Sequence, residues 1–378
     1  MRYLLIALIP LFLGPVFETA APVKIVRVPD GGIQPQVLVD DEGTVHLVYF
    51  KGDPAGGDLY YARQVAGRTT FSSPIRINQA AGSAVAVGTI RGGQLAVGED
   101  GRVHVVWNGS SKATPKAGAT PLLYTRLNDD RTGFEVERNV ITWATGLDGG
   151  SSVAAGIDGN VYVVWHAGPH GAPEDERGVY MAMSRDGGRT FERERQVSPE
   201  STGVCGCCGL RAFTKEGGTL FVLYRGAAET VHRDMHLLIS EDHGSSFEHD
   251  LVDPWELNAC PMSSAAVTNS ASGAVAAWQT KEQVYFARVG NEASGIQPVA
   301  APGEARGRKH PVLASRSDGS LLMAWTEGTA WGRGGAMAWQ VYDPDGDLTA
   351  VHGRVEGVPL WSMPAAYVDS DGVFVLMY

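Results

Sequence analysis

The sequence predicts an all-β fold in which similar four-stranded sheets form a ring, and three observations predict it. First, one pattern recurs along the 378 residues: a turn that ends in glycine, then a β-rich strand that ends near an aromatic residue. Second, a further pair of strand-like segments follows each of the first six copies, such as LYYAR at 59–63 and VYFAR at 284–288. Third, the spacing of the copies is regular, because their turn glycines lie 46 to 59 residues apart, at Gly43, Gly101, Gly159, Gly218, Gly273, Gly319 and Gly372.

Such a repeat is typical of a β-propeller with four-stranded blades. A single four-stranded sheet cannot cover its own two faces, whereas blades stacked around an axis bury them and protect their edges. We count seven repeats and therefore expect seven blades. An arrangement of six blades is the alternative, if one of the hairpins is an insertion.

The turn at the start of each copy predicts a tight hairpin. Asp or Gly precedes most of the turn glycines, and Asp-Gly or Gly-Gly between apolar runs is typical of two-residue hairpins, in which both turn positions have positive φ. The high glycine content, 48 residues, agrees with many such turns.

The two chain ends are expected to meet. The seventh copy stops at Tyr378 after only two strands, and residues 23–28 (VKIVRV) have the composition of an outer strand that could complete its sheet. We therefore expect one propeller domain over 22–378.

The N-terminus has the features of a signal peptide. Arg2 precedes an apolar run over 3–17, and Thr19-Ala20-Ala21 offers small residues for cleavage. We expect a signal peptide at 1–21, a secreted or periplasmic protein and no membrane span in the mature chain; an uncleaved anchor is the competing interpretation.

The charge balance disfavours nucleic acid as a partner. The chain has 31 Lys and Arg against 42 Asp and Glu, a net charge of −11, which repels phosphate backbones. We expect a monomer.

Two segments share the pattern S-x-D-x-G-x-x-F between the third and fourth strands of their repeats. They are formed by Ser184, Asp186, Gly188 and Phe191, and by Ser240, Asp242, Gly244 and Phe247. This pattern resembles the Asp-box, or BNR repeat, of sialidases and sialidase-like propellers. The resemblance implies a structural role, in which Asp bonds turn amides, Gly allows a left-handed bend and Phe packs on the core. In that family the motif lies away from the active site.

The standard catalytic residues of sialidases are not recognisable. The family binds the substrate carboxylate with three arginines and uses a Tyr–Glu pair with an acid/base Asp. The nearest match to its R-I-P motif, Ile75-Arg76-Ile77, lacks the proline and falls in an outer strand. Whether the protein is an enzyme stays open; if it is, the resemblance implies a sialidase-like glycoside hydrolase.

Topology nevertheless indicates one face as the functional one. Connections that enter the first strand of a blade and those that leave its second strand meet at the mouth of the channel, where propellers usually bind ligands. We expect Arg91, Arg225 and Arg233 to bind ligand there, and Asp53, Asp234 and Glu327 are the acid/base candidates. Trp331 adds a stacking surface in a glycine-rich loop.

All four cysteines, which are Cys205, Cys207, Cys208 and Cys260, fall on the same rim. With His166 and His310 from the flanking blades they would suit Cu(I) or Zn, although C-x-C-C is not a standard zinc-ribbon spacing. Two disulfides are the alternative, for example Cys260 with one of the other three and a close bridge between the remaining two. Free thiols are the third interpretation.

The sequence therefore predicts an exported sialidase-like propeller that binds or processes an extracellular, glycan-like ligand at the channel mouth. A metal-binding or redox propeller is one alternative, and a non-catalytic interaction module is another. The sequence does not distinguish among them.

Overall fold

The computed structural model describes residues 23–113, 120–168, 172–215, 217–271, 273–290, 295–304 and 307–378. The segment predicted as a signal peptide, 1–21, lies outside these residues. Within them the structure is all-β apart from four one-turn 3₁₀ segments, at Pro29–Gly31, Glu99–Gly101, Glu174–Glu176 and Glu200–Thr202. No helix among the described residues is long and apolar enough to cross a membrane.

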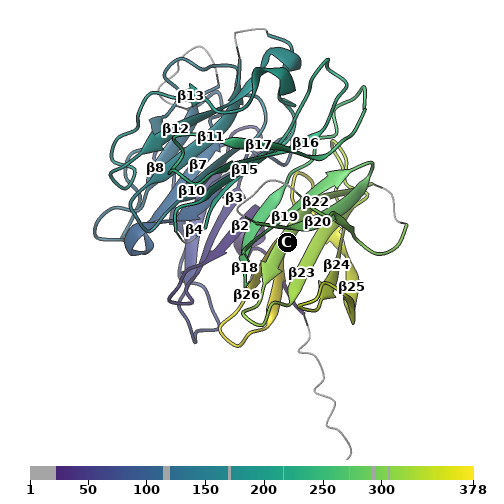
Figure 1. The fold of residues 1–378 in the computed structure, drawn as a ribbon. Coiled ribbons are helices and arrows are strands. Elements are labelled where there is room, and N and C mark those ends of the chain that lie inside the picture. The colour runs from purple at the N-terminus through teal and green to yellow at the C-terminus, as the bar shows by residue number, and fades with distance from the viewer. Residues whose placement is uncertain are drawn as a thin grey trace, which may run out of the picture.

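The strands form seven sheets in sequence order (Figure 1), which confirms the predicted β-propeller. The first three blades are β2 (Ile33–Val39), β3 (Val45–Lys51), β4 (Asp58–Gln64) and β5 (Ile75–Arg76); β6 (Gln94–Val97), β7 (Val103–Asn108), β8 (Leu122–Arg126) and β9 (Arg138–Asn139); and β10 (Ser151–Ala155), β11 (Val161–Ala167), β12 (Gly178–Ser184) and β13 (Arg195–Gln196). The next three are β14 (Arg211–Thr214), β15 (Leu220–Arg225), β16 (Met235–Ser240) and β17 (Glu248–Asp253); β18 (Ala266–Ser270), β19 (Gly273–Thr280), β20 (Gln283–Val289) and β21 (Val299–Ala300); and β22 (Arg308–Ser315), β23 (Leu321–Glu327), β24 (Gly335–Tyr342) and β25 (Leu348–Val358).

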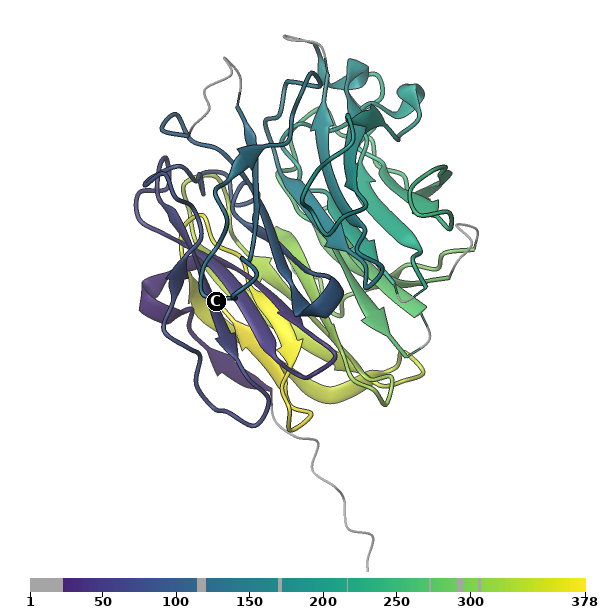
Figure 2. The ribbon, with the colours of Figure 1, turned by 90° about the vertical axis from the view of Figure 1, so that its left-hand side faces the viewer.

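The seventh blade closes the ring with both ends of the chain. It contains β26 (Ala365–Val368), β27 (Phe374–Met377) and β1 (Lys24–Val26), and β1 pairs with β27 in parallel. Figure 2 shows these first and last strands side by side. The prediction that residues 23–28 complete the last sheet is confirmed, and the six-bladed alternative is wrong.

The first strands of the blades surround the axis. Each contacts the first strand of the next blade, from β2 through β6, β10, β14, β18 and β22 to β26, and β26 contacts β2. Apolar clusters fill the space between neighbouring sheets; one joins Phe50 and Leu59 of the first blade to Val105 and Trp107 of the second. Burial of these faces stabilises the ring, because no blade is covered on both sides alone.

The hairpin turns differ in detail from the prediction. All seven turn glycines have positive φ, but of the described residues that precede them only Asp100 and Gly217 have positive φ as well. At Gly43, for example, the amide donates to the Asp40 carbonyl, so the turn spans four residues and glycine is its last. The two-residue hairpin was therefore wrong for most blades, because a four-residue turn needs the left-handed conformation only at its end.

Candidate functional site

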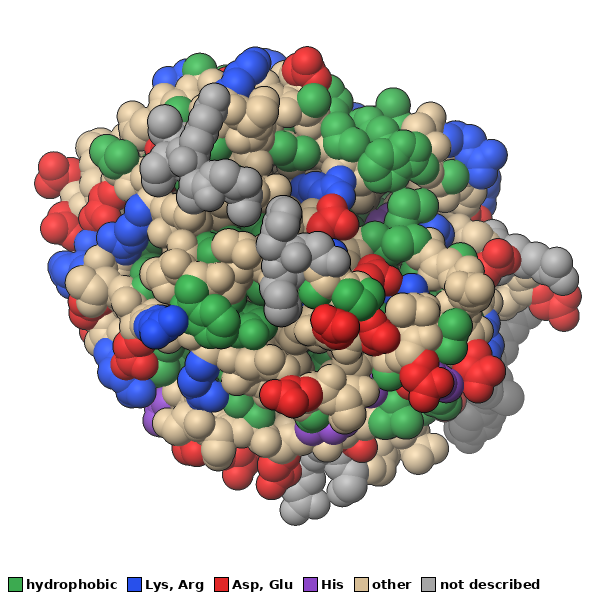
Figure 3. All heavy atoms as spheres, turned by 90° about the horizontal axis from the view of Figure 1, so that it is seen from above, with side chains coloured by type: hydrophobic (Ala, Val, Ile, Leu, Met, Phe, Trp, Pro, Cys, Tyr) green, Lys and Arg blue, Asp and Glu red, His purple; other side chains and the backbone are tan. Residues whose placement is uncertain are grey.

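A segment between blades 1 and 2 lies over the channel mouth. Glycines of two other blades lie so close to Ile90 that they leave little or no room for a side chain. A Cβ atom on Gly209 of blade 4 would be 3.4 Å from the Ile90 side chain, and a Cβ atom on Gly150 of blade 3 would be 2.7 Å from the Ile90 carbonyl oxygen. A Cβ on Gly88 would lie 3.3 Å from the Trp331 ring of blade 6. Residues 88–91, which we call the cap segment, therefore contact three other blades. Figure 3 shows this face, with acidic side chains and hydrophobic patches near its middle.

Arg91 anchors the cap segment to blade 3. Its guanidinium donates to the Asp148 carbonyl and carboxylate, both at 2.6 Å, and to the Val87 carbonyl at 2.9 Å. The Arg91 side chain is 21% exposed and that of Asp148 is 52% exposed. A charged donor and a charged acceptor therefore stand together at the surface of the mouth.

The other two predicted arginines are buried. Arg225 donates to the carbonyl oxygens of Arg233 and Gln279, and burial lowers its pKa. Arg233 donates to a Glu174 carboxylate oxygen at 2.6 Å, while its buried Nε has no hydrogen-bond partner in the described part of the chain. Neither guanidinium is open to solvent as Arg91 is.

The three acid/base candidates lie on blades 1, 4 and 6 and have separate partners. Asp53 is exposed and accepts the Ala55 amide, and Asp234 accepts the Trp255 amide. Glu327 accepts hydrogen bonds from Trp325, Arg308 and Arg354. Although burial alone would raise the pKa of Glu327, these donors lower it, which is the opposite of what a general acid requires.

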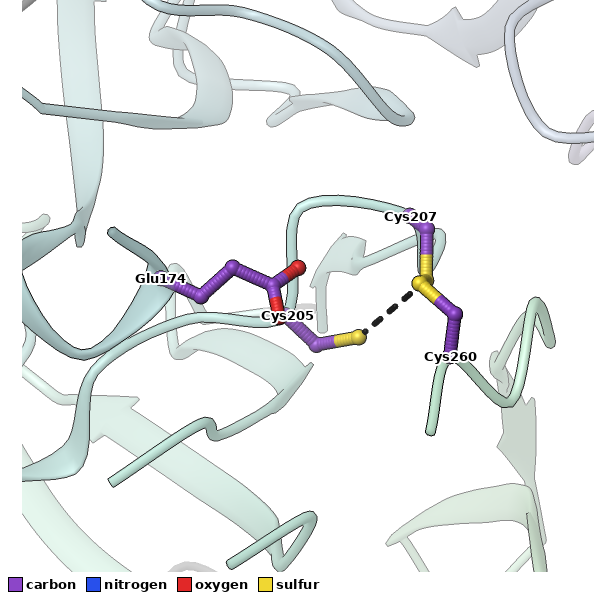
Figure 4. Close-up of side chains that lie close together, drawn as sticks. All are labelled: Glu174, Cys205, Cys207 and Cys260. Carbon is purple, nitrogen blue, oxygen red and sulfur yellow. Dashed lines mark hydrogen bonds between the residues drawn. A yellow bond between two sulfur atoms is a disulfide. The ribbon is translucent and has the colours of Figure 1, made fainter. Parts of the chain in front are cut away.

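The four cysteines do come together, from neighbouring blades 4 and 5. Figure 4 shows three of them, Cys205, Cys207 and Cys260, beside Glu174. Cys207 and Cys260 form a disulfide, while Cys205 and Cys208 are buried free thiols. The Cys205 sulfur lies 3.5 Å from that of Cys207 and 3.1 Å from that of Cys208. The structure thus contains one bridge from Cys260, as in the two-disulfide interpretation, beside a close pair of thiols.

A turn produces this arrangement. The Cys208 amide donates to the Cys205 carbonyl at 3.3 Å, so these residues close a turn around Gly206 and Cys207. In the sequence this segment is a C-x-C-C pattern. It also contains Cys205 and Cys208 at C-x-x-C spacing, which was the missed signal for a sulfur pair.

The two free thiols differ in acidity. The hydrogen bond with Cys208, together with burial, raises the pKa of Cys205. Burial alone would also raise the pKa of Cys208, but the hydrogen bond from Cys205 and the nearby Arg225 charge lower it. Of the pair, Cys208 is therefore the better thiolate.

Glu174 joins the cluster and was not predicted. One carboxylate oxygen accepts the Gly206 amide at 2.6 Å, and the other accepts Arg233. Ligand atoms of Glu174, Cys205, Cys207 and Cys260 all lie within 4.8 Å of one another, so this group could hold a metal ion. In the sequence, Glu174 is marked by the acidic run 174–176, in the connection that follows β11 and His166.

The two predicted histidines lie outside this group of four. His166 accepts the amides of Asp148 and Gly149 through Nε2, and burial lowers its pKa to about 4. His310 bonds the Ser264 hydroxyl through Nδ1, and burial lowers its pKa to about 3. Both rings are neutral at pH 7, and each is hydrogen-bonded to a backbone amide or a side chain of the rim.

A pair of tryptophans forms the other side of the mouth. Trp331 is 57% exposed, and its ring meets that of Trp361 edge to face at a centroid distance of 4.7 Å. The Trp361 carbonyl accepts Gln34 of blade 1, which also bonds the Ala86 carbonyl ahead of the cap segment. The exposed indole is therefore held beside the cap segment.

Solved structures resemble this ring at low sequence identity. A Hadza microbial sialidase matches with a TM-score of 0.53 and 12% identity over 84% of this chain and 67% of its own. The chain has a sialidase-like β-propeller fold. An α-L-arabinofuranosidase from Fusarium graminearum matches with a TM-score of 0.54 and 11% identity over 86% of this chain and 98% of its own. The Trypanosoma rangeli sialidase matches with a TM-score of 0.52 and 12% identity over 82% of this chain and 54% of its own. No protein-family model matches the sequence, and neither does any curated protein.

The S-x-D-x-G-x-x-F segments of this sialidase-like propeller lie on the opposite face, after third strands β12 and β16. In each, the Asp carboxylate accepts the Ser hydroxyl two residues before it and both the amide and the hydroxyl four residues after it. Gly188 and Gly244 have φ near 78° and 77°. Burial would raise the pKa of Asp186, but bonds from Thr190 and Ser184 bring it to about 2.

Proposed function

We propose that this sialidase-like propeller binds an extracellular saccharide at the channel mouth, on the surface formed by Trp331, Trp361 and Arg91. The observation that carries the proposal is the exposed Trp331 ring beside a charged donor and acceptor. The exposed face of the Trp331 indole is free to stack, and a sugar ring offers an apolar face to stack on it.

The charges beside the tryptophans suit a hydroxylated ligand. Asp148 can accept hydrogen bonds from sugar hydroxyls and Arg91 can donate to them, while a carboxylated sugar would compete with Asp148 for the guanidinium. The proposal is binding rather than hydrolysis, because the acid/base candidates lie on three blades with separate partners. The names of the similar sialidases and arabinofuranosidase support a saccharide as the ligand.

Binding can be tested on a printed panel of sialylated, uronic-acid-containing and neutral oligosaccharides, followed by calorimetry with the strongest ligand. Trp331→Ala should weaken binding at least about tenfold, which corresponds to about 1.4 kcal/mol. Trp143→Ala is the matched control: this indole is 47% exposed but its ring contacts Tyr180 of β12 and not the Trp331–Trp361 pair. A wild-type protein that binds no saccharide, or equal losses in both variants, would contradict the proposal.

A second candidate function is metal binding by Glu174, Cys205, Cys207 and Cys260, and their mutual closeness favours it. Three thiolates and a carboxylate suit tetrahedral Zn, and the thiolates alone suit Cu(I). Both require reduction of the Cys207–Cys260 disulfide, because a bridged sulfur is no thiolate.

Elemental analysis tests this candidate. Protein purified with a reductant should carry about one equivalent of Cu or Zn, and the oxidised protein none. Cys207→Ser should lose the metal, whereas Cys208→Ser, outside the group of four, should keep it. Reduced protein without either metal after dialysis against both would exclude the candidate.

A further inference from the structure

We propose that the four cysteines form a thiol–disulfide relay, which passes two electrons between the exposed Cys207–Cys260 bridge and the buried pair of Cys205 and Cys208. The relay goes beyond saccharide or metal binding and depends on neither. Its external partner is a dithiol or disulfide, carried by a small molecule or by another protein.

The four sulfurs are ordered from solvent to interior. Cys260 is exposed, Cys207 is half-buried, and Cys205 and Cys208 are 1% and 4% exposed. Cys205 stands between the two ends, since its sulfur contacts those of both Cys207 and Cys208. A reagent in solution can therefore meet the bridge through Cys260, while the buried pair is reached through Cys205.

A turn at C-x-x-C spacing holds the buried pair together. The hydrogen bond between the Cys208 amide and the Cys205 carbonyl fixes the two residues so that their sulfurs lie 3.1 Å apart. Closing a bond of about 2.05 Å between them requires a shift of only about 1 Å. The buried pair can therefore alternate between a dithiol and a disulfide within the same turn.

The exchange balances in two steps. The pair starts with Cys205 as a thiol and Cys208 as a thiolate. In the first step the Cys208 thiolate takes the proton of Cys205, and the Cys205 sulfur attacks Cys207; the Cys205–Cys207 bond forms, the Cys207–Cys260 bond breaks, and Cys260 leaves as a thiolate that takes a proton from water. In the second, Cys208 loses that proton to water and attacks Cys205, so that Cys207 leaves as a thiolate. The buried pair is oxidised by two electrons and the outer pair is reduced by two, without any further oxidant.

Mapping of single-disulfide protein tests the relay. Reduced protein with a metal chelator is treated with one equivalent of diamide, equilibrated, quenched in acid, alkylated in denaturant and digested for mass spectrometry. The relay predicts both Cys207–Cys260 and Cys205–Cys208 forms, within about tenfold of each other, which corresponds to reduction potentials within about 30 mV. Only the Cys207–Cys260 form, in all preparations, would overturn it.

Two serine variants identify the path. Cys208→Ser blocks the second step. During equilibration the Cys205 proton can pass to water instead of to Cys208, so the first step still occurs and the Cys205–Cys207 bridge should accumulate, with Cys260 alkylated. Cys205→Ser removes the central sulfur and should show Cys207–Cys260 alone. A Cys207–Cys208 bridge in Cys205→Ser would contradict the assigned order. Saccharide binding by the same preparations is a separate readout, so failure of the relay is distinguishable from failure of the proposed function.

Discussion

The S-x-D-x-G-x-x-F turns on one face and several buried side chains at the mouth differ in how fully their polar atoms are hydrogen-bonded. On the turn face, both carboxylate oxygens of Asp186 and of Asp242 accept hydrogen bonds from residues of their own turn. At the mouth, buried polar atoms have no partner in the described part of the chain, among them Asn108 Oδ1, His166 Nδ1 and Thr280 Oγ1. A side chain that is satisfied within its turn stabilises structure, whereas one with unused hydrogen-bonding capacity can serve a ligand.

The carboxylates of the two S-x-D-x-G-x-x-F turns and the charged groups of the mouth also differ in how far apart along the chain their partners are. The Asp carboxylates bond residues two to four positions away, such as Asp186 with Thr190, although the backbone of the same turn accepts Arg126 from 61 positions away. Contacts at the mouth join different blades: Arg91 meets Asp148 57 positions away, and Arg233 meets Glu174 59 positions away. Only the first kind of contact is visible as a short sequence motif.

Acid should lower the unfolding free energy by a similar amount through one buried histidine on each face, and this is the largest effect we expect. Burial lowers the pKa of His104 on the turn side to about 3, as it does for His310 at the mouth. Because the folded-state pKa lies below the unfolded value of about 6.5, the stability that each neutral ring contributes is full above pH 6.5 and is lost as the pH falls towards 3. At pH 5 each ring should cost roughly 2 kcal/mol of unfolding free energy.

Urea denaturation at pH 8, 6 and 5 measures this loss. Variants His104→Gln and His310→Gln should each flatten the pH profile by a similar amount, since burial is the common cause. His352→Gln, on exposed β25, is the control and should leave the profile as it is in the wild type. A loss removed by one of the two buried substitutions alone would show that the faces respond to acid by different routes.

The repeat made the fold predictable. Regular spacing of the turn glycines indicated seven inner hairpins, and the incomplete last copy indicated that residues 23–28 close the ring, which β1 does. Both inferences need only local periodicity and the requirement that every sheet be covered. The type of turn was harder to predict, because four-residue turns and two-residue hairpin turns both have glycine as their last residue.

The site was predictable only in its location. Topology put all four cysteines on one rim, and the structure brings their sulfurs together. Glu174 was missed because its contacts are with Gly206 and Arg233 of another blade. The cap segment was missed because its contacts cross the ring to blades 3, 4 and 6, and no repeat records them.

The smallest expected effect concerns the turn face alone. Asp186→Ala removes the acceptor for Ser184 and for the amide and hydroxyl of Thr190, which should lower the unfolding free energy by about 1 kcal/mol, since the turn is partly solvated. The difference in unfolding free energy between the wild type and Asp186→Ala should become smaller as the pH falls from 4 to 2. Because the folded-state pKa of about 2 lies below the unfolded value of about 3.9, the wild-type advantage is full above pH 4 and fades as the carboxylate becomes protonated.

Urea denaturation of the variant at pH 7 and pH 3 measures both parts of this prediction. Asp129→Ala is the matched control: its exposed carboxylate pairs with Arg102 on the same face, and the change should stay within about 0.5 kcal/mol. Saccharide binding and the disulfide map should be unchanged in Asp186→Ala, because its bonds stay within the turn. A variant that lost saccharide affinity while remaining folded would show that the turn face supports the mouth, and the division between a structural and a functional face would fail.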